Sequence, residues 1–263
     1  MNHLLPETIR ITRAAGQAIM GYYQASFSVT DKKPDNPVTD ADFAADNLLR
    51  EQLMALLPEA GWLSEETADH PARLDRHHVW VVDPLDGTKE FVLGIPEFAV
   101  SVALVAAGQP VLGVVFNPVT GELFHAVQGG GVYLNGVPAG VSPRTQLSGA
   151  RVDASRSEIK RGEFAPFESL VELKVVGSIA YKLARVAAGQ ADATWSRGPK
   201  HEWDICAGVL LVQAGGGQCL DLNDRPFTFN QARPKVNGIV ADNGHLHAAI
   251  RATLAPLGAA RHE

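Results

Sequence analysis

The chain has 263 residues, 46% of them hydrophobic, and a formal net charge of −6 at pH 7. This length and apolar content predict a sizeable buried core and argue against disorder. The acidic balance, without a basic run of five or more residues, argues against binding of nucleic acid polymers. Cys206 and Cys219 predict no disulfide framework, and no continuous hydrophobic segment indicates a membrane span or a signal peptide, which favours a cytoplasmic location.

The first part of the chain is expected to be helical. An apolar stripe predicts one helix over residues 4–24, followed by a polar loop over 30–37. Thr39 has the features of an N-cap, with Asp42 three residues later as the acidic half of a capping box. A second apolar pattern then continues to Pro58 and predicts another helix.

Antiparallel β-structure is predicted for the middle of the chain. Apolar, β-branched runs indicate strands over 61–64, 79–83, 98–107, 111–116, 123–127 and 132–134. Asn135-Gly136 then predicts a hairpin turn, while residues 67–78 read as a charged surface loop.

Strands and helices alternate beyond about residue 142, as is typical of α/β layers. The expected strands are 151–154, 174–176, 191–195 and 239–241, with helices over 179–188, over 203–213 and at the end. A composition shift near 141–143 divides the chain into an N-terminal α+β part, 1–142, and a C-terminal α/β part, 143–263.

The segment Val79–Phe91 carries the strongest functional signal. Its apolar strand is expected to break at Asp83-Pro84, since proline offers no N–H to a β-ladder, and Asp86-Gly87-Thr88 predicts a turn that opens a helix. Two neighbouring carboxylates repel each other and are tolerated mainly around a cation, which for all-oxygen ligands favours Mg²⁺. The N–H groups after Asp86 are expected to face the same place and bind phosphate. On its own, however, such a segment is also compatible with a purely structural acidic turn.

Three further acidic residues stand at predicted element ends, and each has a structural explanation of its own. Asp42 fits helix capping, Glu65 fits a solvated loop, and Asp204 fits neutralisation of a helix N-terminus. A functional interpretation therefore depends on the residues taken together.

Three segments, in this order, resemble the motifs of the inositol monophosphatase-like phosphatases, which are Mg²⁺-dependent and lithium-sensitive. They are Ser64-Glu65-Glu66, Asp83-Pro84-Leu85-Asp86-Gly87-Thr88 and Trp203-Asp204-x-x-Ala207-Gly208. The resemblance spans residues 36–243 and implies a layered αβαβα sandwich of the inositol monophosphatase/fructose-1,6-bisphosphatase type. Residues 36–42, Leu85, Thr88–Phe91 and Ser155-Arg156-Ser157 most resemble the 3′(2′),5′-bisphosphate nucleotidases.

The resemblance implies a role for each matched residue, at a site with two or three Mg²⁺ ions. The implied metal ligands are Glu65, Asp83, the carbonyl of Leu85, Asp86 and Asp204, with Asp83 bridging two ions. Asp42 and Thr88 are the implied catalytic pair, which orients and deprotonates the attacking water. The implied substrate-binding residues are Gly87, Thr88, Ser155, Ser157, Gly177, Ser178, Lys182 and Arg197.

Substrate recognition is the least determined feature. Lys182 matches a nucleotide-contacting lysine of the nucleotidases, with a solvated helix face as the alternative. Arg197 stands near where inositol phosphatases place a glutamate for sugar hydroxyls, and an arginine there suits a second phosphate. Glu158 departs from the histidine that nucleotidases often carry, which leaves base and ribose recognition open.

The implied reaction converts adenosine 3′,5′-bisphosphate and water to AMP and phosphate by in-line attack. An inositol or other sugar monophosphatase on the same fold, and a catalytically silent binder of phosphorylated ligands, remain alternatives. The DxDGT motif of haloacid dehalogenase phosphatases fits less well, because Asp83 and Asp86 are three residues apart rather than two. The implied partner is a small phosphate monoester, not a nucleic acid polymer or a membrane; a homodimer is compatible, although the sequence does not specify the oligomeric state.

Overall fold

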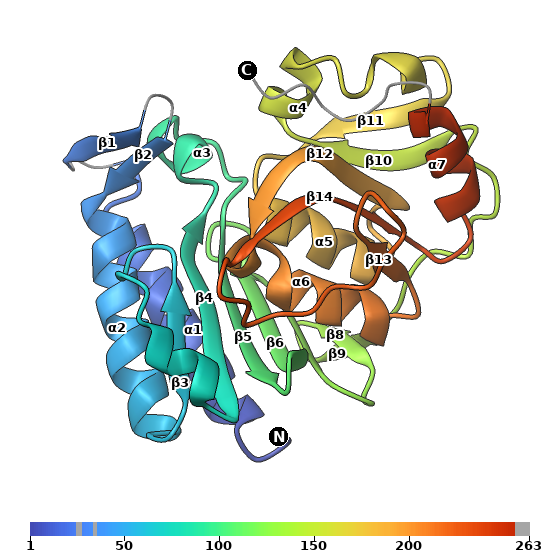
Figure 1. Ribbon diagram of the computed structural model, residues 1–263. Coiled ribbons are helices and arrows are strands. Elements are labelled where there is room, and N and C mark those ends of the chain that lie inside the picture. Colours follow the sequence, from blue (N-terminus) through green and yellow to red (C-terminus); the bar gives the residue numbers. More distant parts are fainter. Residues whose placement is uncertain (25–27, 34–35, 256–263) are drawn as a thin grey trace.

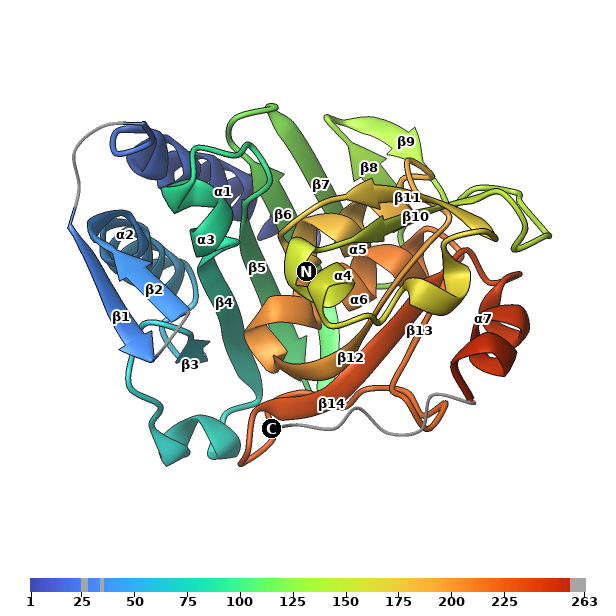
Figure 2. The ribbon, with the colours of Figure 1, turned by 90° about the horizontal axis from the view of Figure 1, so that it is seen from above.

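The computed structural model describes residues 1–24, 28–33 and 36–255. Helices and β-sheets alternate in five layers (Figures 1 and 2). Helices α1 and α2 cover one face of a seven-stranded sheet, α5 and α6 lie between the two sheets, and α7 packs on the outer face of a five-stranded sheet. The layered αβαβα sandwich expected from the sequence is confirmed.

The seven-stranded sheet has the order β3-β4-β5-β6-β7-β8-β9. Its strands are β3 (Gly61–Ser64), β4 (His78–Asp86), β5 (Ala99–Ala106), β6 (Gln109–Asn117), β7 (Glu122–Val127), β8 (Val132–Leu134) and β9 (Val137–Ala139). Only β3 and β4 pair in parallel within this sheet, so the expected antiparallel middle of the chain is confirmed. The predicted Asn135-Gly136 turn joins β8 to β9, with both residues at positive φ.

The five-stranded sheet comes from the C-terminal part of the chain and has the order β11-β10-β12-β14-β13. Its strands are β10 (Ala150–Ala154), β11 (Val171–Val175), β12 (Ala193–His201), β13 (Gln218–Leu220) and β14 (Lys235–Asp242). Strand β12 extends well beyond the predicted end at Trp195. A register irregularity between Ser196 and Pro199 lets it accommodate the proline and continue.

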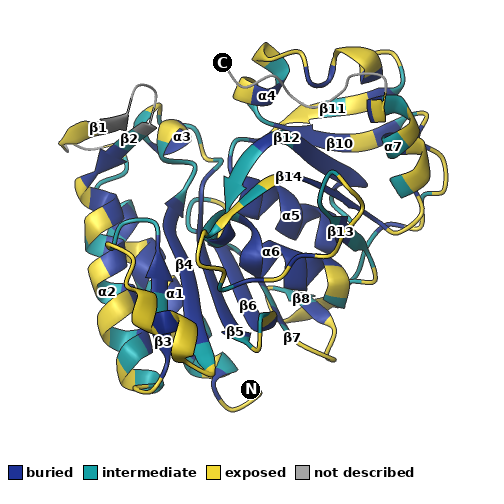
Figure 3. Cartoon of the chain, in the orientation of Figure 1, coloured by how far each residue is buried: buried dark blue, intermediate teal, exposed yellow. Residues whose placement is uncertain are grey.

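The long helices form where the apolar patterns predict them. They are α1 (Leu5–Met20), α2 (Asp40–Leu56), α5 (Ile179–Ala187), α6 (Glu202–Ala214) and α7 (His247–Leu254); α3 (Thr88–Val92) and α4 (Arg156–Lys160) are short, as are the 3₁₀ segments η1 (Pro71–Asp75) and η2 (Ala165–Phe167). Helices α5 and α6 are buried almost all round because they lie between two sheets (Figure 3). Within the described ranges, no helix is long and apolar enough to cross a membrane.

Two further local predictions are wrong. The segment 30–37 is not a loop, because β1 (Val29–Lys33) pairs antiparallel with β2 (Asn36–Thr39); residues 34–35 lie outside the described residues. Strand β4 does not end at Asp83-Pro84 but continues to Asp86. Its pairing with β5 has a register irregularity between Asp83 and Asp86, which removes the need for an N–H at proline.

The two predicted parts share a hydrophobic core. One cluster joins Val79 and Phe124 of the seven-stranded sheet to Leu183 and Ala207 of the helices that follow residue 142. Nothing in this shared core marks a boundary, so the division at residue 142 stays a prediction.

Candidate active site

A pocket of about 380 Å³ opens where the end of β4 meets the beginnings of α4, α5 and α6. It is lined by Pro37, Glu65, Asp83, Leu85, Asp86, Gly87, Thr88, Lys89, Glu90, Ser155, Ser157, Glu158, Arg161, Gly177, Ile179, Lys200, His201, Trp203 and Asp204. Ten of the residues selected from the sequence are in this set, although they come from segments up to 139 positions apart.

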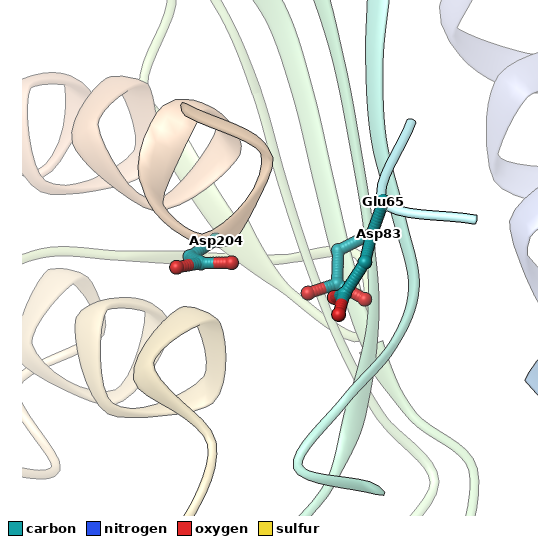
Figure 4. Close-up of side chains that lie close together, drawn as sticks. All are labelled: Glu65, Asp83 and Asp204. Carbon is teal, nitrogen blue, oxygen red and sulfur yellow. The ribbon is translucent and has the colours of Figure 1, made fainter. Parts of the chain in front are cut away.

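Three carboxylates meet in the pocket. Glu65 follows β3, Asp83 lies in β4 and Asp204 is in the first turn of α6. Each offers an oxygen within 4.8 Å of the others, and Asp204 faces Glu65 and Asp83 from the opposite side (Figure 4). The backbone N–H of Leu85 donates to Asp83 Oδ1 at 3.0 Å, and that of His201 donates to Asp204 Oδ2 at 2.8 Å, which fixes both side chains.

Asp86 lies in the same pocket but is held by the start of α5. Its Oδ2 accepts hydrogen bonds from the Ser178 hydroxyl at 2.5 Å and from the Ala180 N–H at 2.6 Å. Ser178 is therefore in contact with the site through Asp86, although it does not line the pocket.

The electrostatics of this cluster favour a bound cation. Burial raises the pKa of Asp83 well above its ordinary value, and the charges of Glu65, Asp86 and Asp204 act in the same direction. Burial likewise raises the pKa of Asp86 to about 6 and that of Asp204 to about 8. A cation would remove the repulsion, and donors that are all oxygen suit a hard ion such as Mg²⁺. The residues present therefore fit the metal that the sequence implies.

Asp42 contacts the pocket through Thr88. Its Oδ2 accepts from both the N–H and the hydroxyl of Thr39, at 2.8 and 2.7 Å, so the predicted capping box is confirmed. Its Oδ1 lies 3.1 Å from Thr88 Oγ1, which also lies 3.0 Å from the carbonyl oxygen of Leu85. The two oxygens of one carboxylate thus serve the helix cap and Thr88 separately.

Two glycines let the backbone approach the pocket closely. Gly87 has φ +97°, and a Cβ there would lie 2.9 Å from the carbonyl oxygen of Glu97. A Cβ on Gly177 would lie 2.1 Å from Cδ of Glu90, which is an outright overlap. A side chain at either position would displace the chain around the pocket.

The structure separates the predicted substrate-binding residues into two groups. Ser155, Ser157 and Gly177 line the pocket, whereas Lys182 and Arg197 are outside the lining set. Lys182 is completely buried and its ammonium lies 2.5 Å from Glu158 Oε2, so the alternative of a solvated helix face is wrong. The backbone N–H of Arg197 donates to Glu163 Oε2 at 2.7 Å.

Arg161, Lys200 and Asp46 are among the polar residues near the pocket that the sequence did not identify. Arg161 and Lys200 line it, and Asp46 holds the segment that carries Glu65. Lys200 lies only four residues before Asp204, so its proximity to that motif was a usable signal. Arg161 and Asp46 likewise lie four residues from Ser157 and Asp42, but sequence spacing alone does not show which of these side chains reaches the site.

The comparisons with known proteins agree on one family. The model of the inositol monophosphatase family matches residues 2–258. An inositol-1-monophosphatase of Rhizobium meliloti (strain 1021) is 38% identical over 238 residues, which cover 86% of this chain and 85% of that protein. The 3′(2′),5′-bisphosphate nucleotidase CysQ of Aggregatibacter actinomycetemcomitans is 34% identical over 248 residues, or 89% of this chain and 90% of that one.

A solved structure is also similar over most of the chain. The crystal structure of the extragenic suppressor protein suhB from Bartonella henselae is similar with a TM-score of 0.84 and 31% sequence identity. The similarity covers 94% of this chain and 96% of that one. The chain therefore belongs to the inositol monophosphatase family.

Proposed function

We propose that this chain is a Mg²⁺-dependent phosphomonoesterase that prefers 3′(2′),5′-bisphosphate nucleotides and converts adenosine 3′,5′-bisphosphate to AMP and phosphate. The observation that carries the proposal is the composition of one pocket. It combines the carboxylates of Glu65, Asp83 and Asp204 with the cations Arg161 and Lys200. Such a pocket suits a substrate with one phosphate for the metal cluster and a second anionic group for the cations.

The metal would be held by Glu65, Asp83 and Asp204, whose carboxylates each offer an oxygen within 4.8 Å of the others, together with Asp86 and the carbonyl of Leu85. We propose two or three Mg²⁺ ions, the number that the family resemblance implies. Bound Mg²⁺ supplies positive charge to the phosphate oxygens and lowers the pKa of water. The N–H groups of Gly87 and Thr88 are proposed to donate to the same phosphate.

The attacking water is assigned to Thr88 and Asp42. Thr88 Oγ1 has a single proton and two acceptors at similar distance, Asp42 Oδ1 at 3.1 Å and the Leu85 carbonyl at 3.0 Å. When the hydroxyl donates to Asp42, its lone pairs can accept a proton from water, and the carboxylate is the stronger base of the pair. The capping bonds to Asp42 Oδ2 keep Oδ1 aimed at Thr88 during this exchange.

The preference for a bisphosphate rests on Arg161 and Lys200. Glu163 Oε1 accepts from Arg161 Nε at 2.7 Å, which orients the half-exposed guanidinium. A charge-assisted contact to a second phosphate contributes about 1.5–3 kcal/mol, or roughly tenfold to a hundredfold in discrimination. A sugar monophosphate has only neutral hydroxyls to offer the same cations.

Inositol 1-phosphate is the second candidate substrate, and one observation favours it. Glu158 lines the pocket as a buried carboxylate, and a carboxylate oxygen is a good acceptor for a sugar hydroxyl. The name of the Rhizobium meliloti relative, an inositol-1-monophosphatase, supports the same candidate.

Side-by-side measurement of phosphate release tests the proposal. The expected result is a higher kcat/KM for adenosine 3′,5′-bisphosphate than for inositol 1-phosphate, with no turnover in excess chelator. A higher value for inositol 1-phosphate would replace the nucleotidase assignment with the sugar-phosphatase one. No phosphate release from either substrate with Mg²⁺ would favour the silent binder. A cytoplasmic location stays a prediction from the sequence, and a homodimer stays compatible with it.

A further inference from the structure

Asp46 is a nearly buried carboxylate that holds the segment on both sides of Glu65. It is 5% exposed and lies on α2, one turn after Asp42. Its Oδ1 accepts from the Ser64 hydroxyl at 2.5 Å, and its Oδ2 accepts from the Thr67 hydroxyl at 2.6 Å. Both carboxylate oxygens of Asp46 therefore accept hydrogen bonds from the four-residue stretch Ser64–Thr67.

This stretch is mostly outside regular secondary structure. Ser64 is the last residue of β3, and the chain leaves the sheet at Glu65, whose N–H still donates to the Val82 carbonyl at 3.3 Å. Beyond that bond, residues 65–70 form neither helix nor strand. The two hydroxyl contacts of Asp46 thus fix the position from which the Glu65 side chain reaches Asp83 and Asp204.

Asp42 and Asp46 lie four residues apart, so they project from the same face of α2. Asp42 contacts Thr88, while Asp46 contacts the segment that carries Glu65. A single rigid helix therefore sets two separate parts of the pocket relative to each other.

We propose that Asp46 is a positioning residue that sets the affinity of the acidic cluster for divalent cations. The inference rests on the metal dependence in the proposed function. Without a bound cation, the like charges of the cluster favour rotation of Glu65 away from Asp83 and Asp204. Asp46 limits that movement by holding the side chains of Ser64 and Thr67 on both sides of Glu65, so less ordering remains for the moment of binding.

The test uses Mg²⁺ alone, titrated into the full chain by isothermal titration calorimetry. Asp46→Ala removes both contacts, and Asp46→Asn keeps the shape of the side chain but loses its charge. The matched control is Asp40→Asn, which removes the same charge from the exposed first turn of the same helix. We expect Asp46→Ala to weaken Mg²⁺ binding by about 10–100-fold, Asp46→Asn to weaken it less, and Asp40→Asn to leave it unchanged.

A second measurement distinguishes positioning from general damage to the fold. Turnover of the Asp46 variants should recover to within a few-fold of the parent at saturating Mg²⁺, because the ligands and Thr88 are intact. Thr67→Val, which removes one of the two hydroxyls, serves if Asp46→Ala does not fold, and should also weaken Mg²⁺ binding.

The possible failures are distinguishable. If the folded Asp46 and Thr67 variants bind Mg²⁺ as tightly as the parent chain, the positioning role is wrong while the proposed function stands. If the parent chain itself binds no Mg²⁺, the metal dependence of the proposed function fails, and the positioning role falls with it. A loss of turnover that saturating Mg²⁺ does not restore would also overturn the positioning role.

Discussion

The Lys182 ammonium lies 2.5 Å from Glu158 Oε2, with the two side chains only 0% and 2% exposed. Burial opposes ionisation of Glu158, yet the charges of Lys182 and Lys200 and a hydrogen bond from Lys182 hold its pKa at about 2. The backbone N–H of Ser155 donates to the same oxygen at 2.7 Å. Lys182 therefore neutralises Glu158, the residue at the position where the resemblance to nucleotidases implies a histidine. In this arrangement the Lys182 ammonium faces Glu158.

Breaking this ion pair should destabilise the protein. Lys182→Met leaves Glu158 charged, buried and without its main counter-ion, a change that costs about 3–5 kcal/mol of the free energy of unfolding. The double variant Lys182→Met/Glu158→Leu removes both charges and should recover most of that loss. Denaturant unfolding measures both, with Lys160→Met, an exposed lysine on α4, as the control. A double variant less stable than Lys182→Met would contradict this interpretation.

The same pair predicts a response to acid. The pKa of Glu158 is about 2 in the folded chain, below its ordinary value of 4.5. A lowered pKa of an acid contributes stability that is present above the unfolded value and is lost as pH falls through the folded one. The parent chain should therefore lose stability between about pH 4.5 and pH 2 with a contribution that the double variant lacks. Identical profiles of stability against pH for the parent chain and the double variant would exclude this contribution of Glu158.

The acidic cluster predicts the opposite trend at higher pH. Because burial raises the pKa of Asp86 to about 6 and that of Asp204 to about 8, the folded metal-free chain binds protons more tightly than the unfolded one. That stability is complete below the unfolded pKa, near 4, and is lost as pH rises through 6 to 8. Glu202, whose pKa burial raises to about 7, adds to the same trend.

Thermal unfolding in chelator and in Mg²⁺ measures this effect. In chelator, Tm should fall between pH 5 and pH 8, and Mg²⁺ should remove most of the fall because it neutralises the cluster. Asp83→Asn should raise Tm at pH 8 in chelator while nearly abolishing turnover. Equal pH profiles with and without Mg²⁺ would show that the cluster holds no metal in this range.

Thr88 is expected to contribute to turnover more than to substrate binding. Thr88→Val keeps the shape of the side chain but removes the hydroxyl that lies 3.1 Å from Asp42 Oδ1. General-base assistance contributes about 10²–10⁴-fold, so kcat should fall by that order with little change in KM. Thr88→Ser retains the hydroxyl and should keep most of the rate. An unchanged kcat in Thr88→Val would remove Thr88 from the mechanism.

Arg161 and Arg197 provide a matched pair for substrate preference. Arg161 lines the pocket and Arg197 does not, although both are arginines in the C-terminal part. Arg161→Ala should lower kcat/KM for adenosine 3′,5′-bisphosphate about tenfold to a hundredfold while changing hydrolysis of a simple monophosphate little. Arg197→Ala should leave the ratio of the two substrates unchanged. The reverse pattern would assign the second phosphate to Arg197, as the sequence alone suggested.

The amino-acid sequence by itself determined the features that depend on neighbouring residues. The Thr39–Asp42 capping box, the Asn135-Gly136 hairpin and the turn at Gly87 form as predicted, because each depends on backbone preferences and hydrogen bonds within a few positions. The motif containing Asp83 was recognisable in the sequence, although strand β4 continues through Asp83-Pro84 to Asp86 rather than ending there. The pocket itself is not local, because it brings together Glu65, Asp83 and Asp204 from segments up to 139 positions apart.

Tertiary structure decided the partners of the long polar side chains. Glu158 of α4 and Lys182 of α5 are 24 residues apart and meet only in the folded chain, so helical periodicity could not separate a buried lysine from a solvated one. Lys200 reaches the pocket because β12 continues beyond the predicted end at Trp195, through an irregularity between Ser196 and Pro199. Asp46 finds Ser64 and Thr67 only when α2 lies beside β3. Local propensities fix where elements begin and end, whereas the pairing of buried charges depends on the whole packed chain.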